Sequence, residues 1–276
     1  MMFKRHEFNT SFAWQGATRP LRRLTDQQAR DWDELGYFVV ENAIDQAGLD
    51  RLIAAIDPFE KAGEEFLRSK GGRIFIARAD EITFTTNLAL NSDVVREFVT
   101  GEVFQDLCLD LIGPDARLYW DMAVYKKPGT TEPFPWHQDN GYTYVDPQQY
   151  ITCWVALTDA TPDNGCPHVV PGAHREGTYQ HQITSLGFVC TDQQPDSAVT
   201  VPVKAGSIVV MSSLAPHATG PNLTDGIRKA LIAEYIPDGA VTIRKEKDGT
   251  MISSPCNMER HLVVLKDGRA PVAAAA

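Results

Sequence analysis

The sequence predicts a mainly β fold with flanking helices, of the antiparallel sandwich or jelly-roll type. Two observations support this class: helical periodicity in the first third of the chain, and many short β-rich runs separated by turn residues from Ala116 onward. The composition, 43% hydrophobic and 22% charged, is typical of a globular protein. Residues 1–276 are expected to form one domain, helical over about 25–115 and with a jelly-roll core over about 116–245.

The first third of the chain contains three helical patterns. Thr25 and Gln28 have the spacing of a capping box at the start of the first helix. Apolar residues recur at helical spacing over 45–57, and Pro58 is expected to interrupt this helix or to start a new one. Residues 80–112 are expected to be helical as well.

Seven short runs of β-forming residues follow, and each predicts a strand. Turn sequences such as KKPG, TPDNG, KAGS and PDG separate them, as in an antiparallel sandwich. The runs are 117–127, 149–157, 166–172, 200–206, 207–213, 228–237 and 242–247.

Charge and cysteine content exclude several classes of partner. The net charge of −10 opposes binding to nucleic acid or to anionic membranes. The five cysteines, odd in number and without a C-x-x-C motif, favour reduced thiols in the cytoplasm. No apolar run is long enough to span a membrane, and the first 16 residues lack the apolar segment of a secretory signal. The tail at 270–276 is expected to be disordered, and no feature indicates an oligomeric state.

Two potential metal ligands, His137 and Asp139, lie two residues apart in a loop before an apolar run. If this segment is extended, both side chains point to the same side and can bind one metal ion. His217 is the best third ligand, because a sandwich can bring the end of the run at 207–213 beside His137. Two imidazoles and one carboxylate leave three positions of an octahedral metal open, the arrangement of non-haem Fe(II) oxygenases.

Arg228 lies eleven residues after His217, at the start of an apolar strand. It is expected to point into the sandwich, where a lone charge is costly and requires a partner. A guanidinium group matches a carboxylate in bidentate geometry, and the hydroxyl of Thr219 can reach the same carboxylate. The pattern therefore predicts a site for a carboxylate cosubstrate.

These motifs resemble the phytanoyl-CoA dioxygenase (PhyH) family over roughly residues 25–237. The resemblance implies a double-stranded β-helix, a cupin-like jelly roll, with Fe(II) on His137, Asp139 and His217. It also implies that Arg228 and Thr219 bind the distal carboxylate of 2-oxoglutarate and that Trp154 lies near this cosubstrate. The residues that carry the resemblance are Trp136-His137-Gln138-Asp139, Trp154, Asn164-Gly165-Cys166, Pro171-Gly172-Ala173-His174, Pro216-His217 and Arg228.

The implied reaction uses O2 to hydroxylate an unactivated C–H bond of a small or medium organic substrate, with release of succinate and CO2. An oxidative cyclase, desaturase or epimerase on the same iron site is the open alternative, as is a cupin-like metalloenzyme or binding protein that does not use 2-oxoglutarate. Arg228 argues against this last class. The cluster of Arg19, Arg22 and Arg23 is a weak indication of a CoA substrate, whose phosphates need a basic patch.

The remaining predictions concern the surroundings of the site. Lys126 and Lys127 precede a turn and are expected to be solvated. Tyr119, Asp121 and Tyr125 alternate along one run, and their common face is expected to reach the pocket.

Three further histidines, His6, His181 and His261, are expected at the surface. The irregular segments 63–90 and 178–197 are expected to shape the substrate pocket, since long loops are often functional.

Overall fold

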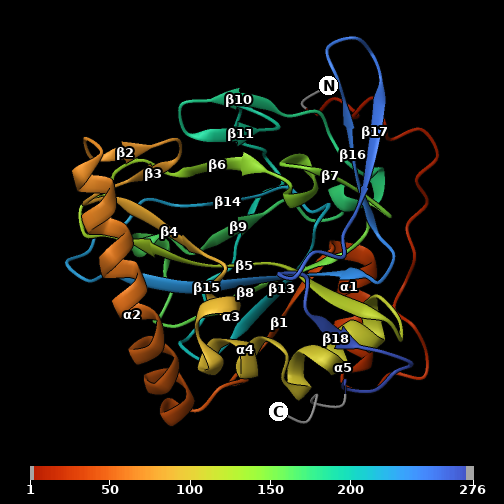
Figure 1. Cartoon of the computed structure of the whole chain (residues 1–276), viewed down its shortest axis with the longest axis horizontal. Helices are drawn as coiled ribbons and strands as arrows, with labels where there is room; N and C mark the ends of the chain where they lie inside the picture. Colours follow the sequence, from red (N-terminus) through yellow and green to blue (C-terminus); the bar gives the residue numbers. More distant parts are fainter. Residues whose placement is uncertain (1–2, 272–276) are drawn as a thin grey trace.

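Two stacked antiparallel sheets with helices against one of them make up the structure (Figure 1). The computed structural model describes residues 3–271. The last part of the tail that is predicted to be disordered, from residue 272 onward, lies outside the described residues. The prediction of a mainly β fold with flanking helices is confirmed.

The major sheet has the strand order β1-β13-β8-β15-β5-β4-β3-β2, and β18 also pairs with β5. Strand β15 lies near its centre, paired antiparallel with β8 on one side and β5 on the other. The strands are β1 (Tyr37–Val40), β2 (Arg73–Ile74), β3 (Ala77–Arg78), β4 (Ile82–Thr86), β5 (Ala116–Lys126), β8 (Ile151–Ala156), β13 (Ile208–Ser212), β15 (Arg228–Pro237) and β18 (Val263–Leu265).

The minor sheet, β12-β9-β14-β6, lies above the major sheet in Figure 1. A hairpin, β10-β11, and a three-stranded sheet, β17-β16-β7, lie beside it. The bounds are β6 (Phe134–His137), β7 (Tyr144–Asp146), β9 (Pro167–Val169), β10 (Gln182–Thr184), β11 (Gly187–Val189), β12 (Val199–Thr200), β14 (His217–Thr219), β16 (Val241–Lys245) and β17 (Met251–Pro255).

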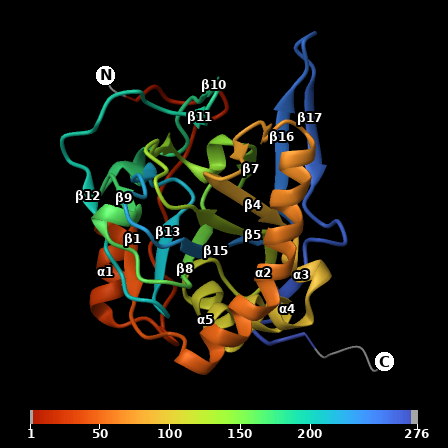
Figure 2. The same cartoon turned by 90° about the vertical axis from the view of Figure 1, so that its left-hand side faces the viewer.

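The α-helices of the described residues lie before β5 in the sequence, and Figures 1 and 2 show α1, α4 and α5 below the major sheet and α2 along its side. None of these helices has the length and apolar character that a bilayer span requires. The bounds are α1 (Asp26–Leu35), α2 (Gln46–Ser69), α3 (Leu88–Asn91), α4 (Asp93–Val99) and α5 (Glu102–Leu111).

Local signals predicted one helix start correctly and misjudged two other segments. Thr25 and Gln28 form the predicted capping box of α1. Pro58 neither interrupts nor starts a helix, since α2 continues through it. Residues 82–86 are not helical but form β4, because their pairing with β5 outweighs local propensity.

Side chains alternate along β15 between two separate cores. Leu231, Ala233 and Tyr235 pack with the helices on the outer side of the major sheet. Ala230 packs with Trp154 in the space between the two sheets. The period of two residues therefore assigns Arg228, which has the same parity as Ala230, to the space between the sheets.

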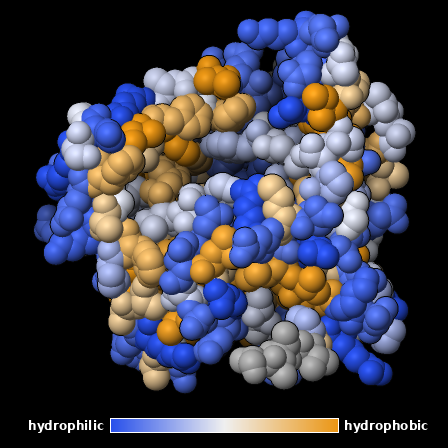
Figure 3. Space-filling view, viewed as in Figure 1, coloured by the Kyte–Doolittle hydropathy of each residue, from blue (hydrophilic) through white to orange (hydrophobic). Residues whose placement is uncertain are grey.

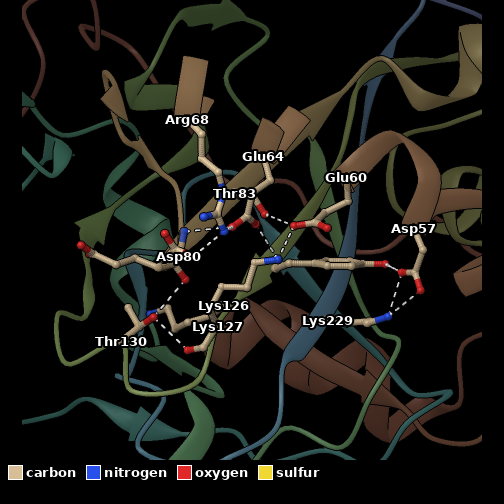
Figure 4. Close-up of polar contacts among 12 residues, drawn as sticks. Asp57, Glu60, Glu64, Arg68, Asp80, Thr83, Lys126, Lys127, Thr130 and Lys229 are labelled. Carbon is tan, nitrogen blue, oxygen red and sulfur yellow. Dashed lines mark hydrogen bonds and ion pairs between the residues drawn. The ribbon is translucent and has the colours of Figure 1, made fainter. Parts of the chain in front are cut away.

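Lys127, the residue directly after β5, forms ion pairs with α2, so the prediction that it is solvated is wrong. Its Nζ lies 2.5 Å from Oε1 of Glu60 and 2.7 Å from Oε2 of Glu64, on successive turns of α2 (Figure 4). The Glu60 carboxylate also accepts a hydrogen bond from Thr83 of β4. Helix packing creates this cluster, which the turn sequence after Lys127 does not indicate.

We expect Lys127→Met to lower the free energy of unfolding by about 3 kcal/mol, because the nearly buried carboxylate of Glu60 would lose its cation and that of Glu64 would keep only Arg68. Urea unfolding at pH 7 measures this change. Lys245→Met is the matched control, since its ion pair with Glu7 is exposed and should change stability by about 0.5 kcal/mol or less. Equal effects of the two substitutions would contradict the prediction.

The difference in the free energy of unfolding between wild type and Lys127→Met should depend on pH. Burial raises the pKa of Glu64, but hydrogen bonds from Lys127, Asp80 and Arg68 outweigh this effect, and the net pKa lies below 4.5. A depressed carboxyl pKa stabilises the folded state above the unfolded pKa, and this contribution is lost as pH falls through the folded value. The difference between wild type and Lys127→Met should therefore shrink as the pH falls below about 4.5.

Candidate active site

Three potential metal ligands converge between the two sheets. His137 ends β6 and His217 begins β14, and the two strands pair so that these residues are directly opposite. Asp139 begins the short 3₁₀ turn that follows β6. Its Oδ1 lies 3.7 Å from Nε2 of His137 and 3.6 Å from Nε2 of His217. One ion with bonds of about 2.0–2.2 Å can bridge such atoms.

Both imidazoles are held with Nε2 toward the centre. Nδ1 of His137 lies 2.8 Å from the carbonyl oxygen of Pro135, and Nδ1 of His217 lies 3.0 Å from that of Ala215. A proton on Nδ1 donates to each carbonyl, which leaves the Nε2 lone pair free for a metal. Burial, and then the neighbouring His217, lower the pKa of His137 well below its usual value, so this imidazole is neutral.

The carboxylate of Asp139 is oriented by a residue of the major sheet. Thr152, on β8, donates its hydroxyl hydrogen to Oδ2 of Asp139 at 2.5 Å. The other oxygen, Oδ1, faces both imidazoles. Thr152 therefore fixes which carboxylate oxygen can bind a metal, and it links the minor-sheet ligands to the major sheet.

Gln138, between His137 and Asp139, fixes the backbone of both. It is fully buried, and its side-chain amide donates to the carbonyl oxygens of Gly177 and Leu214. Its own backbone N–H donates to Nε2 of His181. Sequence reasoning missed this role, because the partners come from segments that are distant in the chain.

Of the histidines predicted at the surface, His261 is buried and His181 is partly buried. His261 is almost fully buried, and the ring of His181 packs against Gly141 so closely that no side chain would fit there. The position of His181 is set by its hydrogen bonds to Gln138 and to the carbonyl of Tyr179. The surface prediction is therefore wrong for His261, whereas His181 is partly exposed but fixed by these hydrogen bonds.

Arg228 points into the space between the sheets, as predicted, and is only 1% exposed. Its guanidinium lies over the indole ring of Trp154, 5.3 Å from the ring centroid. None of its three side-chain nitrogens has a hydrogen-bond partner among residues 3–271. Burial lowers the pKa of Arg228 to about 10, so it stays charged at neutral pH. A buried cation with five free donors is a site for an anion.

Lys126 is a second buried basic side chain in the same place, which contradicts the prediction that it is solvated. It is directly opposite Arg228 in the β5-β15 pair and has no exposed surface. Its Nζ donates to the carbonyl oxygen of Gly220 at 2.5 Å and to the hydroxyl of Thr219 at 3.3 Å. Burial, and then the charges of Arg228 and Arg78, lower the pKa of Lys126 to about 6.

The inward face of β5 is not the predicted one. Asp121 and Tyr125 point away from the pocket: Asp121 accepts the N–H of Ala89, and Tyr125 donates to Asp57 of α2. The face of β5 that carries Lys126 lines the space between the sheets. Lys126, Val124 and Met122 of β5 are opposite Arg228, Ala230 and Ile232 of β15, whose side chains point into this space. Sequence alternation defined the two faces but could not tell which one the helices cover.

Two hairpins meet above the site. The ring of Phe75, between β2 and β3, contacts that of Phe188 on β11, with centroids 6.2 Å apart. Phe188 also packs on Tyr142, whose ring contacts His137. Figure 3 shows the surface hollowed below the β10-β11 hairpin, with apolar side chains on its rim. The predicted pocket-shaping segments 63–90 and 178–197 contribute these two hairpins.

Comparisons with known proteins agree with this geometry. The sequence model of the phytanoyl-CoA dioxygenase (PhyH) family matches residues 32–230. Phytanoyl-CoA dioxygenase 1 of Oryza sativa subsp. japonica is 27% identical over 79% of this chain and 90% of its own. The methylphosphonate hydroxylase of Gimesia maris is 29% identical over 77% of this chain and 80% of its own.

Solved structures share the fold. The non-heme alpha ketoglutarate dependent carbocyclase SnoK from nogalamycin biosynthesis has a TM-score of 0.69 at 24% identity, covering 87% of this chain and 96% of its own. The epimerase SnoN, solved with Fe3+ and alpha ketoglutarate, has a TM-score of 0.67 at 20% identity, covering 87% and 98%. These likenesses confirm the predicted jelly roll.

The family match covers most of the chain, and it agrees with the motifs from which the resemblance was inferred. The cofactors are therefore iron and 2-oxoglutarate, with O2 as oxidant. The chain belongs to the phytanoyl-CoA dioxygenase family of iron- and 2-oxoglutarate-dependent dioxygenases.

Proposed function

We propose that His137, Asp139 and His217 bind the iron and that the enzyme hydroxylates an unactivated C–H bond of a small or medium organic molecule. The observation that carries this proposal is the buried cation of Arg228, with the buried amine of Lys126 opposite it, beside the three converging ligands. Arg228 and Lys126 have no anionic partner within hydrogen-bonding distance among residues 3–271. A buried cation without a partner is costly, and the carboxylate of a cosubstrate offsets this cost.

Iron bound at this centre supplies, with 2-oxoglutarate and O2, the oxidant that breaks the C–H bond, and succinate and CO2 are released. The residues of the protein bind and orient 2-oxoglutarate. Arg228 offers a planar fork to the distal carboxylate, Thr219 adds a hydroxyl, and the ring of Trp154 supports the guanidinium. Lys126 adds a buried amine that donates to Thr219, a role that sequence reasoning did not assign.

A second outcome on the same iron is supported by one observation, the fold shared with a carbocyclase and an epimerase. Oxidative cyclisation, desaturation or epimerisation would leave no oxygen atom in the product. Incorporation of ¹⁸O from ¹⁸O2 into the product is expected for hydroxylation, and its absence would assign one of the other three outcomes.

The basic cluster near the start of the chain does not support a CoA substrate. Arg19 pairs with Asp26, and Arg22 and Arg23 pair with Asp106 of α5, below the major sheet. These arginines are therefore engaged within the protein, on the side away from the minor sheet. We propose a small-molecule substrate whose class is set by the side chains around the iron.

We also infer a reducing, cytoplasmic location and no nucleic-acid partner. The five cysteines are free thiols and all are buried, and the net charge is −10. The helical part and the jelly-roll core are proposed to be one domain, since helices and major sheet share one hydrophobic core.

Anaerobic titration of the Fe(II) protein with 2-oxoglutarate should give a saturable visible charge-transfer band. We expect Arg228→Ala to raise the dissociation constant of 2-oxoglutarate about 100-fold, because it removes a bidentate, charge-assisted contact. Lys126→Met should raise it about 10-fold. Lys229→Met, the neighbour that pairs with Asp57 on the outer face, is the control and should leave the constant unchanged. A constant unaffected by Arg228→Ala would place the cosubstrate elsewhere.

Thr152→Val should weaken metal binding about 10- to 100-fold, because Asp139 would lose the hydrogen bond that orients it. Co(II) titration under anaerobic conditions measures this affinity. Thr83→Val is the matched control. It also removes a buried hydroxyl group, but this hydroxyl donates to Glu60 in the separate cluster at α2, so Co(II) affinity should not change. Equal Co(II) affinities in wild type and Thr152→Val would show that Asp139 needs no support from Thr152.

A further inference from the structure

The inner face of β15 carries a second ionisable residue, Glu234, six residues after Arg228. Pairing along β15 is regular from Arg228 to Glu234, so both side chains are on the same face. The neighbour of Glu234 on β8 is Thr152, and its neighbour on β5 is Trp120. Thr152 is the residue that holds Asp139, so Glu234 lies beside the proposed iron centre and not at the cosubstrate end of the strand.

Glu234 has no partner within the described part of the chain. Its residue is 7% exposed, and it forms neither a hydrogen bond nor an ion pair with any residue from 3 to 271. Trp120, Met122 and Ile232, on the same inner face, are only partly buried although their strands are central in the sheet. The space between the sheets is therefore open at this level, and the carboxyl group of Glu234 borders this opening.

The surroundings of Glu234 are acidic and aromatic. The carboxylate of Asp139 lies on the same side of the sheet, held by Thr152, the neighbour of Glu234 on β8. The hydroxyl of Tyr142, whose ring contacts His137, also lacks a partner. No cation of the described residues forms an ion pair with Glu234, whereas Lys127 and Lys229, on the outer face, each pair with carboxylates of α2.

We propose that Glu234 is the specificity-determining residue of the substrate pocket and that it binds a positively charged nitrogen of the substrate, such as an ammonium group. This inference rests on the proposed function, since it assumes that the substrate lies between Glu234 and the iron. It assigns opposite charges to two positions on the inner face of β15: Arg228 binds the dicarboxylate cosubstrate, and Glu234 binds the cationic substrate.

The chemistry of a carboxylate favours this ligand over others. An ionised carboxylate only accepts hydrogen bonds, and it requires a cation or several donors when it is removed from water. An anionic substrate group would face both Glu234 and Asp139, which like-charge repulsion opposes. A neutral hydroxyl group would form a hydrogen bond but no ion pair, so it should bind more weakly than an amine of the same shape.

The binding test uses Zn(II) protein saturated with 2-oxoglutarate, which cannot turn over. Primary amines of four to ten carbons are compared by calorimetry with the alcohols and carboxylic acids of the same skeleton. We expect the best amine to bind at least ten times more tightly than its alcohol and its acid. Glu234→Gln should reduce the preference for the amine over the alcohol to less than twofold.

Failure of this inference is distinguishable from failure of the proposed function. Glu234→Gln must still bind Zn(II) and 2-oxoglutarate with wild-type affinity, whereas a wrong iron or cosubstrate assignment would appear in the Arg228→Ala and Thr152→Val titrations. A panel in which no amine is preferred by the wild type overturns the inference. A preference that persists in Glu234→Gln overturns it as well.

A second measurement needs no ligand. If the function of Glu234 is to bind substrate, its unpaired carboxyl group destabilises the protein without substrate. Glu234→Gln and Glu234→Met should then raise the melting temperature or leave it unchanged. Glu234→Gln keeps the shape, and Glu234→Met also removes the polar group. A lower melting temperature in both variants would identify Glu234 as a structural residue and would overturn the inference.

Discussion

The antiparallel pairing of β15 with β5 and β8 is the constraint on which the site depends. It fixes the alternation that turns one face to the helices and the other to the minor sheet. Arg228 and Glu234 are about 20 Å apart along the inner face, from the rise of an extended strand. Thr152 of β8 hydrogen-bonds Asp139, so the positions of Asp139, Arg228 and Glu234 all follow from one register. A shift of one residue would turn every inner side chain outward.

Much of the site was predictable from the sequence because its chemistry depends on residue type and order. Few physical explanations other than ligand binding fit these features. They are the spacing of His137 and Asp139, the position of His217 after an apolar run, and the lone arginine at the start of the next strand. The structure brings all of them together between the sheets. The first helix was predictable for a similar reason, since the capping box of Thr25 is a local interaction.

The residues that were missed owe their roles to contacts between distant segments. Lys126 and Lys127 are adjacent in a turn-like sequence, yet one faces Arg228 and the other the acids of α2, because β5 has different neighbours on its two faces. Gln138 and His181 act through a hydrogen bond that spans 43 positions in the sequence. Residues 82–86 form a strand because β5 offers an open edge, which helical periodicity cannot indicate.

The burial of the five cysteines has a consequence for an enzyme that handles O2 next to iron. Thiolates are the form of cysteine that peroxide oxidises, and access decides how fast. Burial raises the pKa of Cys166 to about 11 and that of Cys190 to about 12, and it raises the pKa of Cys108, Cys153 and Cys256 as well. The thiols are thus both protonated and out of reach. A reactive oxygen species released at the iron therefore meets no accessible thiolate among these five cysteines.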